Sequence, residues 1–260
     1  MRPDKKIKSA GGRLLRAVYP RACPICERLL REPSGDAVFI NNGVFEDPFI
    51  CKECAQDIDY ISGRRCILCS RKLEEDGELC PLCRRTKRYF DAGYGLMLHD
   101  DYARKTVYDL KDSAINDNAD FIGLEIAYRY GRQIEMWAPD AMIPVPVHPE
   151  RLKERGFNQA QLIADKIVLY MKKLGFKTVP VDTEYLIRTG KTQKQKTIDP
   201  ALRAANMDGA FSVAGPLSKY RCVLLVDDIF TTGATLNECA RVLRGRGTER
   251  VFFITASIVP

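Results

Sequence analysis

The sequence predicts an α/β protein in which a parallel sheet flanked by helices follows a small domain that is held together by metal ions. Three observations support this prediction. Eight of the ten cysteines form four Cys-x-x-Cys pairs between Cys23 and Cys83. After residue 90, strand-like and helix-like segments alternate. The run Cys222–Val226 is apolar throughout, as is typical of a central parallel strand, and a helical pattern follows it.

The composition excludes several classes of protein. The chain has 260 residues, of which 45% are hydrophobic and 29% charged, so it can bury a core and is neither disordered nor fibrous. No run approaches the roughly 18 apolar residues that cross a bilayer, so we expect no membrane span. The N-terminus is basic but lacks the apolar segment of a secretion signal. We therefore expect a cytoplasmic protein.

The paired cysteines are predicted metal ligands, because cytoplasmic thiols stay reduced. Zinc takes four thiolates in a tetrahedron, and each Cys-x-x-Cys turn directs two sulfurs to one point. Four turns predict two structural zinc sites. In the sequential grouping, one site is Cys23, Cys26, Cys51 and Cys54, and the other is Cys66, Cys69, Cys80 and Cys83. Spacing alone leaves an interleaved grouping open. The isolated Cys222 and Cys239 are predicted to be small buried hydrophobic residues.

Changes in composition and residue pattern along the chain predict three parts. Residues 1–20 form a basic N-terminal segment, residues 21–90 a double zinc-ribbon domain, and residues 91–260 the α/β domain. The second part is rich in Cys, Arg and Pro and buries too little apolar surface to fold alone. Its folding is therefore expected to depend on zinc.

The α/β part begins with a strand predicted from the alternation of apolar residues over 90–98. A short helix over 102–111 and a longer one over 118–137 follow. Residues 141–147 are apolar but contain two prolines, which predicts a strand that stops pairing early and opens into a loop at 148–156. Asn158 is the expected cap of the next helix, whose apolar residues repeat from Ile163 to Leu174.

The remaining elements follow the same reasoning. We expect a short strand at 185–187, a long polar loop from residue 188 to 199, and a central strand at 222–226. Leu236, Cys239 and Leu243 have helical spacing, and residues 251–257 supply a last strand.

The central strand ends in Asp227 and Asp228, and a threonine-rich loop then leads into a helix. Backbone amides of such a loop, together with the helix dipole, bind anions. Adjacent carboxylates accept hydrogen bonds from a vicinal diol and interact with a divalent cation. A phosphate beside a diol describes a 5-phosphoribosyl group, bound where open α/β sheets usually bind ligands. Neither a Walker A motif nor a Gly-x-Gly-x-x-Gly fingerprint is present.

This string resembles the phosphoribosyl pyrophosphate (PRPP) motif of type I phosphoribosyltransferases. The cysteine pairs Cys-Pro-Ile-Cys, Cys-Lys-Glu-Cys, Cys-Ile-Leu-Cys and Cys-Pro-Leu-Cys are similar to those of the ComF family. So are the runs Ile143–Gln159, Arg188–Gln193 and Arg203–Phe211. Members of that family join a double zinc ribbon to a phosphoribosyltransferase domain and are associated with DNA uptake in competent bacteria. The resemblance extends from about residue 20 to residue 259.

The resemblance implies roles for individual residues. Asp227 and Asp228 would be the catalytic pair that holds the ribose hydroxyls, with Mg²⁺ accompanying PRPP. Arg151 and Arg155 would lie at the pyrophosphate, and Lys191, Lys194 and Lys196 would belong to a flexible lid. The residues expected to bind the 5′-phosphate are Thr231, Thr232, Gly233, Ala234 and Thr235.

Two functions remain open at this point. One is a protein that handles single-stranded DNA during uptake and carries a site for PRPP or a related ribose 5-phosphate ligand, with partners such as a helicase. The alternative is an active phosphoribosyltransferase that transfers phosphoribose to an unidentified base or amine. The formal net charge of +7 is compatible with a polyanionic partner. The residues predicted to contact DNA are Arg84, Arg85, Lys87 and Arg88 beside Tyr89 and Phe90.

Overall fold

The computed structural model describes residues 22–30, 39–41, 44–46, 49–112, 117–189 and 209–260. At its centre is a four-stranded sheet with the order β3-β8-β7-β4, and all three pairings are parallel. The strands are β3 (Ala92–Leu98), β4 (Ala141–Pro144), β7 (Cys222–Phe230) and β8 (Arg250–Ile258). The parallel α/β sheet predicted from the sequence is confirmed.

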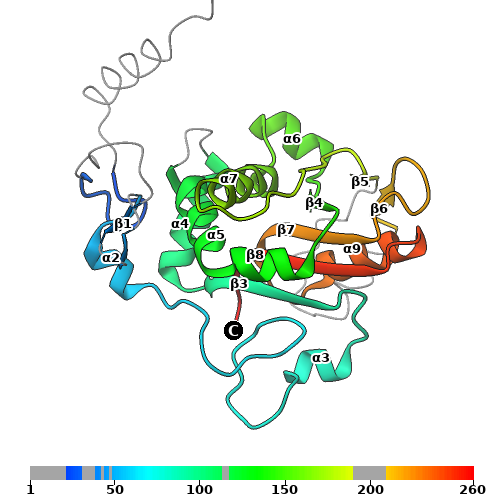
Figure 1. The fold of residues 1–260 in the computed structure, drawn as a ribbon, viewed down its shortest axis with the longest axis horizontal. Helices are drawn as coiled ribbons and strands as arrows, with labels where there is room; N and C mark the ends of the chain where they lie inside the picture. Colours follow the sequence, from blue (N-terminus) through cyan, green and yellow to red (C-terminus); the bar gives the residue numbers. More distant parts are fainter. Residues whose placement is uncertain (1–21, 31–38, 42–43, 47–48, 113–116, 190–208) are drawn as a thin grey trace, which may run out of the picture.

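Helices cover both faces of this sheet (Figure 1). Leu224 and Val226 of β7 share a core with the helices on one face, which are α4 (Asp101–Asp112), α5 (Asp117–Trp137) and α7 (Gln159–Lys173). Val223 and Leu225 point to the opposite face, where they share a core with α9 (Ala234–Gly245). Successive strand residues alternate between faces, so an uninterrupted apolar run indicates a strand covered on both sides.

Short segments cover both edges of the sheet. At the β4 edge, the Met142 amide donates to the Pro180 carbonyl at 2.8 Å, and the Asp182 amide donates to the Met142 carbonyl at 3.0 Å. At the β3 edge, the Leu98 amide donates to the Asp59 carbonyl at 2.9 Å. Exposed strand edges invite unwanted pairing, and these segments prevent it. A separate antiparallel pair consists of β5 (Leu186–Arg188) and β6 (Phe211–Val213).

One predicted loop is wrong. Residues 148–156 contain the helix α6 (Pro149–Arg155). His148 caps it, its Nδ1 accepting from the Glu150 amide at 3.2 Å, and Gly156 ends it with a φ of 80°. Proline at the first helical position and glycine just past the end are strong local signals. The helix buries none of its residues, which explains why it has no apolar period.

The two metal-binding segments repeat one local structure. In each, the residue after the second cysteine has a left-handed φ of 62°, at Glu27 and at Ser70. The first cysteine of each turn donates its amide across the turn at 2.8 Å, from Cys23 to Arg28 and from Cys66 to Arg71. In both segments a short helix begins directly after the third cysteine of the set. These helices are α2 (Lys52–Asp57) and α3 (Pro81–Arg85).

We call residues 22–57 the first ribbon and residues 65–88 the second ribbon. The first ribbon, which contains the hairpin of β1 (Phe39–Asn41) and β2 (Val44–Glu46), packs beside α4 and α7 (Figure 1). Lys105 of α4 donates its Nζ to the Ile25 carbonyl at 2.8 Å. The second ribbon shares the core on the α9 side. The sequence predicted one metal-held module, whereas the described residues place one ribbon on each face of the sheet.

The chain that joins the two ribbons runs along the outer edge of β3. The Ile61 amide donates to the Leu96 carbonyl at 3.1 Å, which adds this segment to the sheet. Backbone hydrogen bonds therefore join segments on the two sides of the predicted domain boundary near residue 90. Within the described residues, no helix combines the length and the apolar character needed to cross a bilayer.

Candidate functional site

The eight paired cysteines form two four-sulfur clusters, grouped sequentially as the sequence favoured. Within each cluster the ligand atoms lie within 4.8 Å of one another. The Cys26 and Cys51 sulfurs are 3.7 Å apart, and those of Cys69 and Cys80 are 3.6 Å apart. A disulfide would bring them to about 2 Å. A zinc tetrahedron with bonds of about 2.3 Å separates its sulfurs by about 3.8 Å, so both clusters fit zinc.

Electrostatics within the second cluster also fit a cation. Contact with Cys66 and Cys83, together with burial, raises the pKa of Cys69 above its ordinary value. Contact with Cys66 is the largest cause that raises the pKa of Cys83 to about 12, whereas the nearby Arg88 guanidinium acts in the opposite direction. Four thiolates at this distance repel one another, and zinc would compensate their charge. A closed four-sulfur site leaves no position for substrate, so both sites are structural.

The acidic pair lies at the carboxyl end of β7, where Asp227 and Asp228 are half-buried. Each carboxylate accepts from the next backbone amide, at 2.9 Å from Asp228 and 2.7 Å from Ile229. Behind the pair lies Cys239, whose pKa is raised by complete burial and by the charge of Asp227. That cysteine is therefore a neutral, inert thiol, and the buried state predicted for it and for Cys222 is confirmed.

The threonine loop, Thr231–Gly233, connects the acidic pair to α9. Thr231 is exposed, and the Thr232 hydroxyl accepts from the Ala234 amide at 3.4 Å. Gly233 has a φ of 74° and is the N-cap residue of α9. Because the loop ends at a helix N-terminus, its amides and the positive end of the helix dipole can act on the same anion. Ala234 and Thr235, the first residues of α9, are half-buried there.

Arg188, at the end of β5, interacts electrostatically with Asp227, although no sequence motif indicated a role for it. Burial and then the positive charge of Arg151 lower its pKa, and the carboxylate of Asp227 acts in the opposite direction. The Arg188 guanidinium lies 5.3 Å above the Phe211 ring. Two positive charges that are close enough to repel each other favour an anion between them. The available sequence signal was an arginine directly before a long polar segment.

The other residues predicted to bind the ligand are placed as follows. Arg151 is exposed on α6, and Arg155 is half-buried in its last turn. The Val145 amide donates to the Val226 carbonyl at 2.8 Å, so α6 starts at the same end of the sheet as the acidic pair. Lys191, Lys194 and Lys196 lie outside the described residues. The residues on either side of that segment are joined, since the Thr189 amide donates to the Ala210 carbonyl at 2.9 Å.

The predicted DNA-contacting cluster is only partly exposed. Arg84, Arg85 and Lys87 are exposed, whereas Phe90 is 2% exposed and packs against the rings of Phe230 and Phe253. Arg88 lies over the Phe90 ring at 5.5 Å, with its Nε and Nη2 atoms buried. Phe90 therefore offers no stacking surface to DNA, because it packs on the sheet where the chain leaves the second ribbon, and Arg88 is only half-exposed beside it. Tyr89 is half-buried beneath Lys87.

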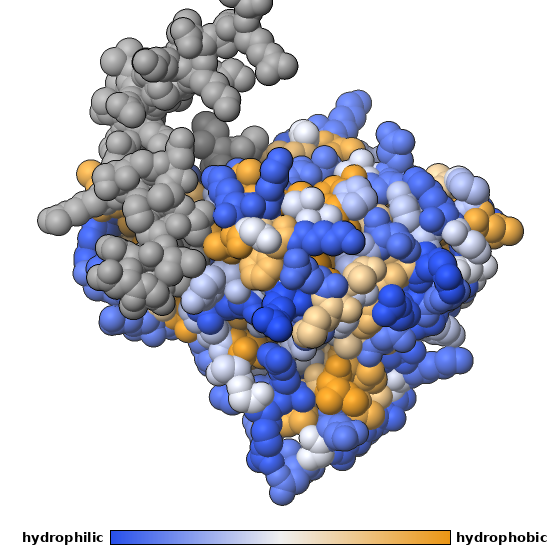
Figure 2. Space-filling model, in the orientation of Figure 1, coloured by the Kyte–Doolittle hydropathy of each residue, from blue (hydrophilic) through white to orange (hydrophobic). Residues whose placement is uncertain are grey.

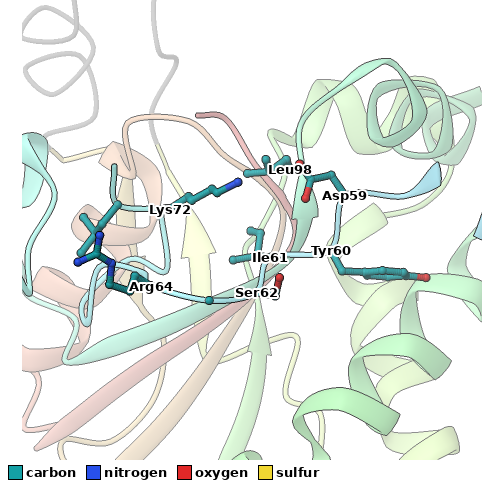
Figure 3. A pocket seen from close by; sticks show the side chains of 9 residues that line it. Asp59, Tyr60, Ile61, Ser62, Arg64, Lys72 and Leu98 are labelled. Carbon is teal, nitrogen blue, oxygen red and sulfur yellow. The ribbon is translucent and has the colours of Figure 1, made fainter. Parts of the chain in front are cut away.

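Two cavities lie elsewhere, where the second ribbon meets the edge of the sheet. One of about 320 Å³ is lined by residues 59–64, and Figure 3 shows the Lys72 side chain extending toward Leu98 across it. The other, of about 580 Å³, lies between the ribbon and Pro260. On the face seen in Figure 2, hydrophobic residues gather over this lower part of the molecule. Neither cavity is lined by the acidic pair or the threonine loop.

The two clusters predict two zinc ions per chain that differ in how fast they are lost. Cys26 is exposed, whereas all four cysteines of the second cluster are buried. A chelator should therefore release zinc in two phases, with the first ribbon as the fast phase. Cys26→Ser should remove that phase and Cys69→Ser the slow one, as measured by a colorimetric zinc indicator. The control Cys222→Ser should keep both ions, and a wild-type chain with fewer than two would contradict the assignment.

The threonine loop depends on glycine at position 233. A Cβ there would lie 2.4 Å from Phe230 Cζ, and the left-handed φ is strained for any other residue. Gly233→Ala should lower the free energy of urea unfolding by about 1–3 kcal/mol. The control is Gly245→Ala at the other end of α9, where a Cβ meets nothing within 4 Å. That change should be neutral or stabilise by up to about 1 kcal/mol. Equal effects of the two changes would contradict the geometry.

Comparisons with known proteins cover both halves of the chain. A family model described as "Double zinc ribbon domain" matches residues 14–85. "Competence protein F" of Haemophilus influenzae is 34% identical over 46% of this chain, an alignment that spans about half (51%) of that relative. "DNA utilization protein YhgH" of Escherichia coli K12 is 27% identical, over 78% of this chain and 94% of that protein. "Competence protein ComFC" of Bacillus subtilis is 24% identical, over 92% and 93%.

Among solved structures, a purine phosphoribosyltransferase from Pyrococcus horikoshii Ot3 overlaps 54% of this chain and 73% of its own. The TM-score is 0.28 and the identity 13%, a likeness too slight to carry an argument. The family assignment therefore stands on the sequence relatives and on the metal-binding segment. The double zinc ribbon at residues 14–85 and the relatives named Competence protein F and ComFC support the resemblance to the ComF family that the sequence motifs indicated.

Proposed function

We propose that the chain binds PRPP, or a related ribose 5-phosphate ligand, at the end of β7, and that it handles single-stranded DNA during DNA uptake. The observation that carries the first part is the turn between β7 and α9. It presents two carboxylates, a threonine loop and a helix N-terminus within a few residues of one another. This combination suits a sugar diol joined to a phosphate.

Each part of the ligand has a matching group in this arrangement. The 5′-phosphate would lie on the amides and hydroxyls of residues 231–235, and the ribose hydroxyls would bond to Asp227 and Asp228. The pyrophosphate would lie toward Arg188 and Arg151, where it relieves the repulsion between these like charges. Mg²⁺ bound with the pyrophosphate would neutralise part of its charge.

Such a site can support either binding or phosphoribosyl transfer. In transfer, the bond from the anomeric carbon to the pyrophosphate breaks while an acceptor nitrogen bonds to that carbon, so no protein nucleophile is needed. The arginines would stabilise the charge that develops on the departing pyrophosphate. No observation on the described residues identifies an acceptor pocket beside the acidic pair, so we propose ligand binding first and transfer to a base or amine second.

The proposed role with DNA rests on the relatives and on surface charge. Proteins named for competence and for DNA utilization align with this chain. Arg84 and Arg85 of α3 and the adjacent Lys87 are exposed cations on the second ribbon. Such cations contact phosphates without reading sequence. Proteins of the uptake machinery, such as a helicase, would be the partners of this role.

Calorimetric titration with PRPP and Mg²⁺ tests the proposed ligand site. Replacing Asp227 and Asp228 by Asn removes the charge from two hydrogen-bond acceptors, and Kd should rise by about 10-fold or more. Arg188→Gln should weaken the binding of PRPP more than the binding of ribose 5-phosphate, because only PRPP carries the pyrophosphate. The control Asp101→Asn changes an exposed carboxylate on α4 and should leave Kd unchanged. Wild-type protein that binds neither ligand would contradict the proposal.

A gel shift with single-stranded DNA tests the second part. Binding should weaken by roughly 10-fold or more between about 50 and 200 mM salt, since phosphate contacts release counterions. Reversing the charges of Arg84, Arg85 and Lys87 should abolish the shift. The control reverses three other exposed cations, Lys172, Lys173 and Lys177, and should retain most of it. Equal losses in both triple variants would indicate an effect of net charge and not a site.

A further inference from the structure

The second ribbon makes a direct hydrogen bond to the threonine loop. Arg71 donates its Nη2 to the Thr231 carbonyl at 2.7 Å, across 160 residues of sequence. Arg71 immediately follows Ser70, the left-handed residue that closes the turn bearing Cys66 and Cys69. The Arg71 carbonyl also accepts the Cys66 amide at 2.8 Å. One residue therefore belongs both to the metal-binding turn and to the support of the loop.

Further contacts join the same two parts. The Arg88 guanidinium is in electrostatic contact with Cys83, and its Nη1 lies 3.4 Å from the point where a Cβ of Gly233 would stand. Asn237, in the first turns of α9, accepts the Tyr89 amide on its Oδ1 at 2.8 Å and donates its Nδ2 to the Lys87 carbonyl at 3.1 Å. The second ribbon and the residue that follows it thus contact the loop at Thr231 and helix α9 at Asn237, and they place Arg88 close to Gly233.

The first ribbon offers an internal comparison. Its residue equivalent to Arg71 is Arg28, which also follows a left-handed residue and also accepts the amide of the first cysteine. Arg28 pairs with Glu53 of its own ribbon at 3.0 Å, and the ribbon packs on α4. The same position in the repeat thus pairs within its own ribbon in the first ribbon and donates to the threonine loop in the second.

We infer that the second zinc ribbon positions the threonine loop for its ligand, with Arg71 as the positioning residue, and that the second zinc and the ligand stabilise each other. The inference rests on the proposed phosphoribosyl site, and it adds that one of the two zinc ions controls the affinity of this site for its ligand. Zinc closure fixes the turn from which Arg71 projects, and Arg71 fixes the carbonyl that begins the loop. A coupling between two sites is reciprocal, so the ligand must also retain the second zinc.

Arg71→Ala and Arg28→Ala form the matched pair of variants. Both should retain two zinc ions by elemental mass spectrometry. In calorimetry with PRPP and Mg²⁺, Arg71→Ala should raise Kd by about 5-fold or more, and Arg28→Ala should leave it unchanged. Arg71→Lys keeps the positive charge but loses the planar guanidinium, and should recover only part of the affinity. If Arg71→Ala loses zinc, Arg71→Lys takes its place in the comparison.

Zinc release tests the reciprocal effect on the unmodified chain. Saturating PRPP with Mg²⁺ should slow the release of the second zinc to a chelator by about 5-fold or more, while the rate for the first zinc stays unchanged. Cys26→Ser, which removes the first site, identifies the phase that responds. Equal protection of both ions, or of neither, would overturn the inference, as would equal Kd values for the two arginine variants.

Hydrogen exchange of the ligand-free protein separates this inference from the proposed function. Amides of residues 231–236 should exchange about 5-fold faster or more in Arg71→Ala than in Arg28→Ala, because the loop opens more often without its support. If wild-type protein fails to bind PRPP while this difference is found, the proposed ligand is wrong and the support of the loop stands. If PRPP binds and the exchange rates are equal, the support is wrong and the ligand stands.

Discussion

Closure of the two four-sulfur clusters is the constraint on which the rest of the structure depends. Neither ribbon is large enough to bury a core of its own, so each needs a metal to close its turn and a surface to complete its packing. The cysteines satisfy both needs, since seven of the eight are also buried in the cores that reach onto the sheet. Loss of either ion therefore exposes part of the core that its ribbon shares with the α/β sheet. The first ribbon shares the core on one face of the sheet, and the second ribbon shares the core on the other face.

The two ribbons are alike in local structure and unlike in what they contact. The local likeness lies in the first Cys-x-x-Cys turn of each ribbon, which is followed by a left-handed residue, Glu27 in the first ribbon and Ser70 in the second. The difference lies in single side chains. Arg28 pairs with Glu53 of its own ribbon, whereas Arg71 donates to the Thr231 carbonyl of the threonine loop. A repeated element can thus acquire a new role through one residue while its metal site is unchanged.

The sequence predicted the sheet well where a period or an uninterrupted apolar run was long. β7 and α9 follow from Cys222–Val226 and from the helical spacing of Leu236 to Leu243. The four cysteine pairs predicted two clusters, but only the fold decides that the grouping is sequential. Helix α6 was not predicted, because all of its sequence signals are in its caps. Strand β6 was not predicted, because three residues are too few to show a period. Phe90 was mistaken for a stacking surface because burial depends on where the second ribbon docks. Arg188 could not be singled out from sequence, because its electrostatic interaction with Arg151 and Asp227 arises only in the folded chain.

Placement of the second ribbon brings the two proposed activities onto one zinc-closed element. Helix α3 starts directly after the zinc ligand Cys80 and carries Arg84 and Arg85. The chain then runs through Lys87 to Arg88, which lies close to Gly233, and to Tyr89, which donates its amide to Asn237 of α9. The exposed cations and the support of the threonine loop are therefore only a few residues apart on one zinc-closed element. A polyanion held by α3 and a phosphate held by the loop would each bias the position of that element, and two ligands that bias one element are thermodynamically coupled. The first ribbon, on the opposite face of the sheet and without a contact of this kind to the loop among the described residues, offers no such route.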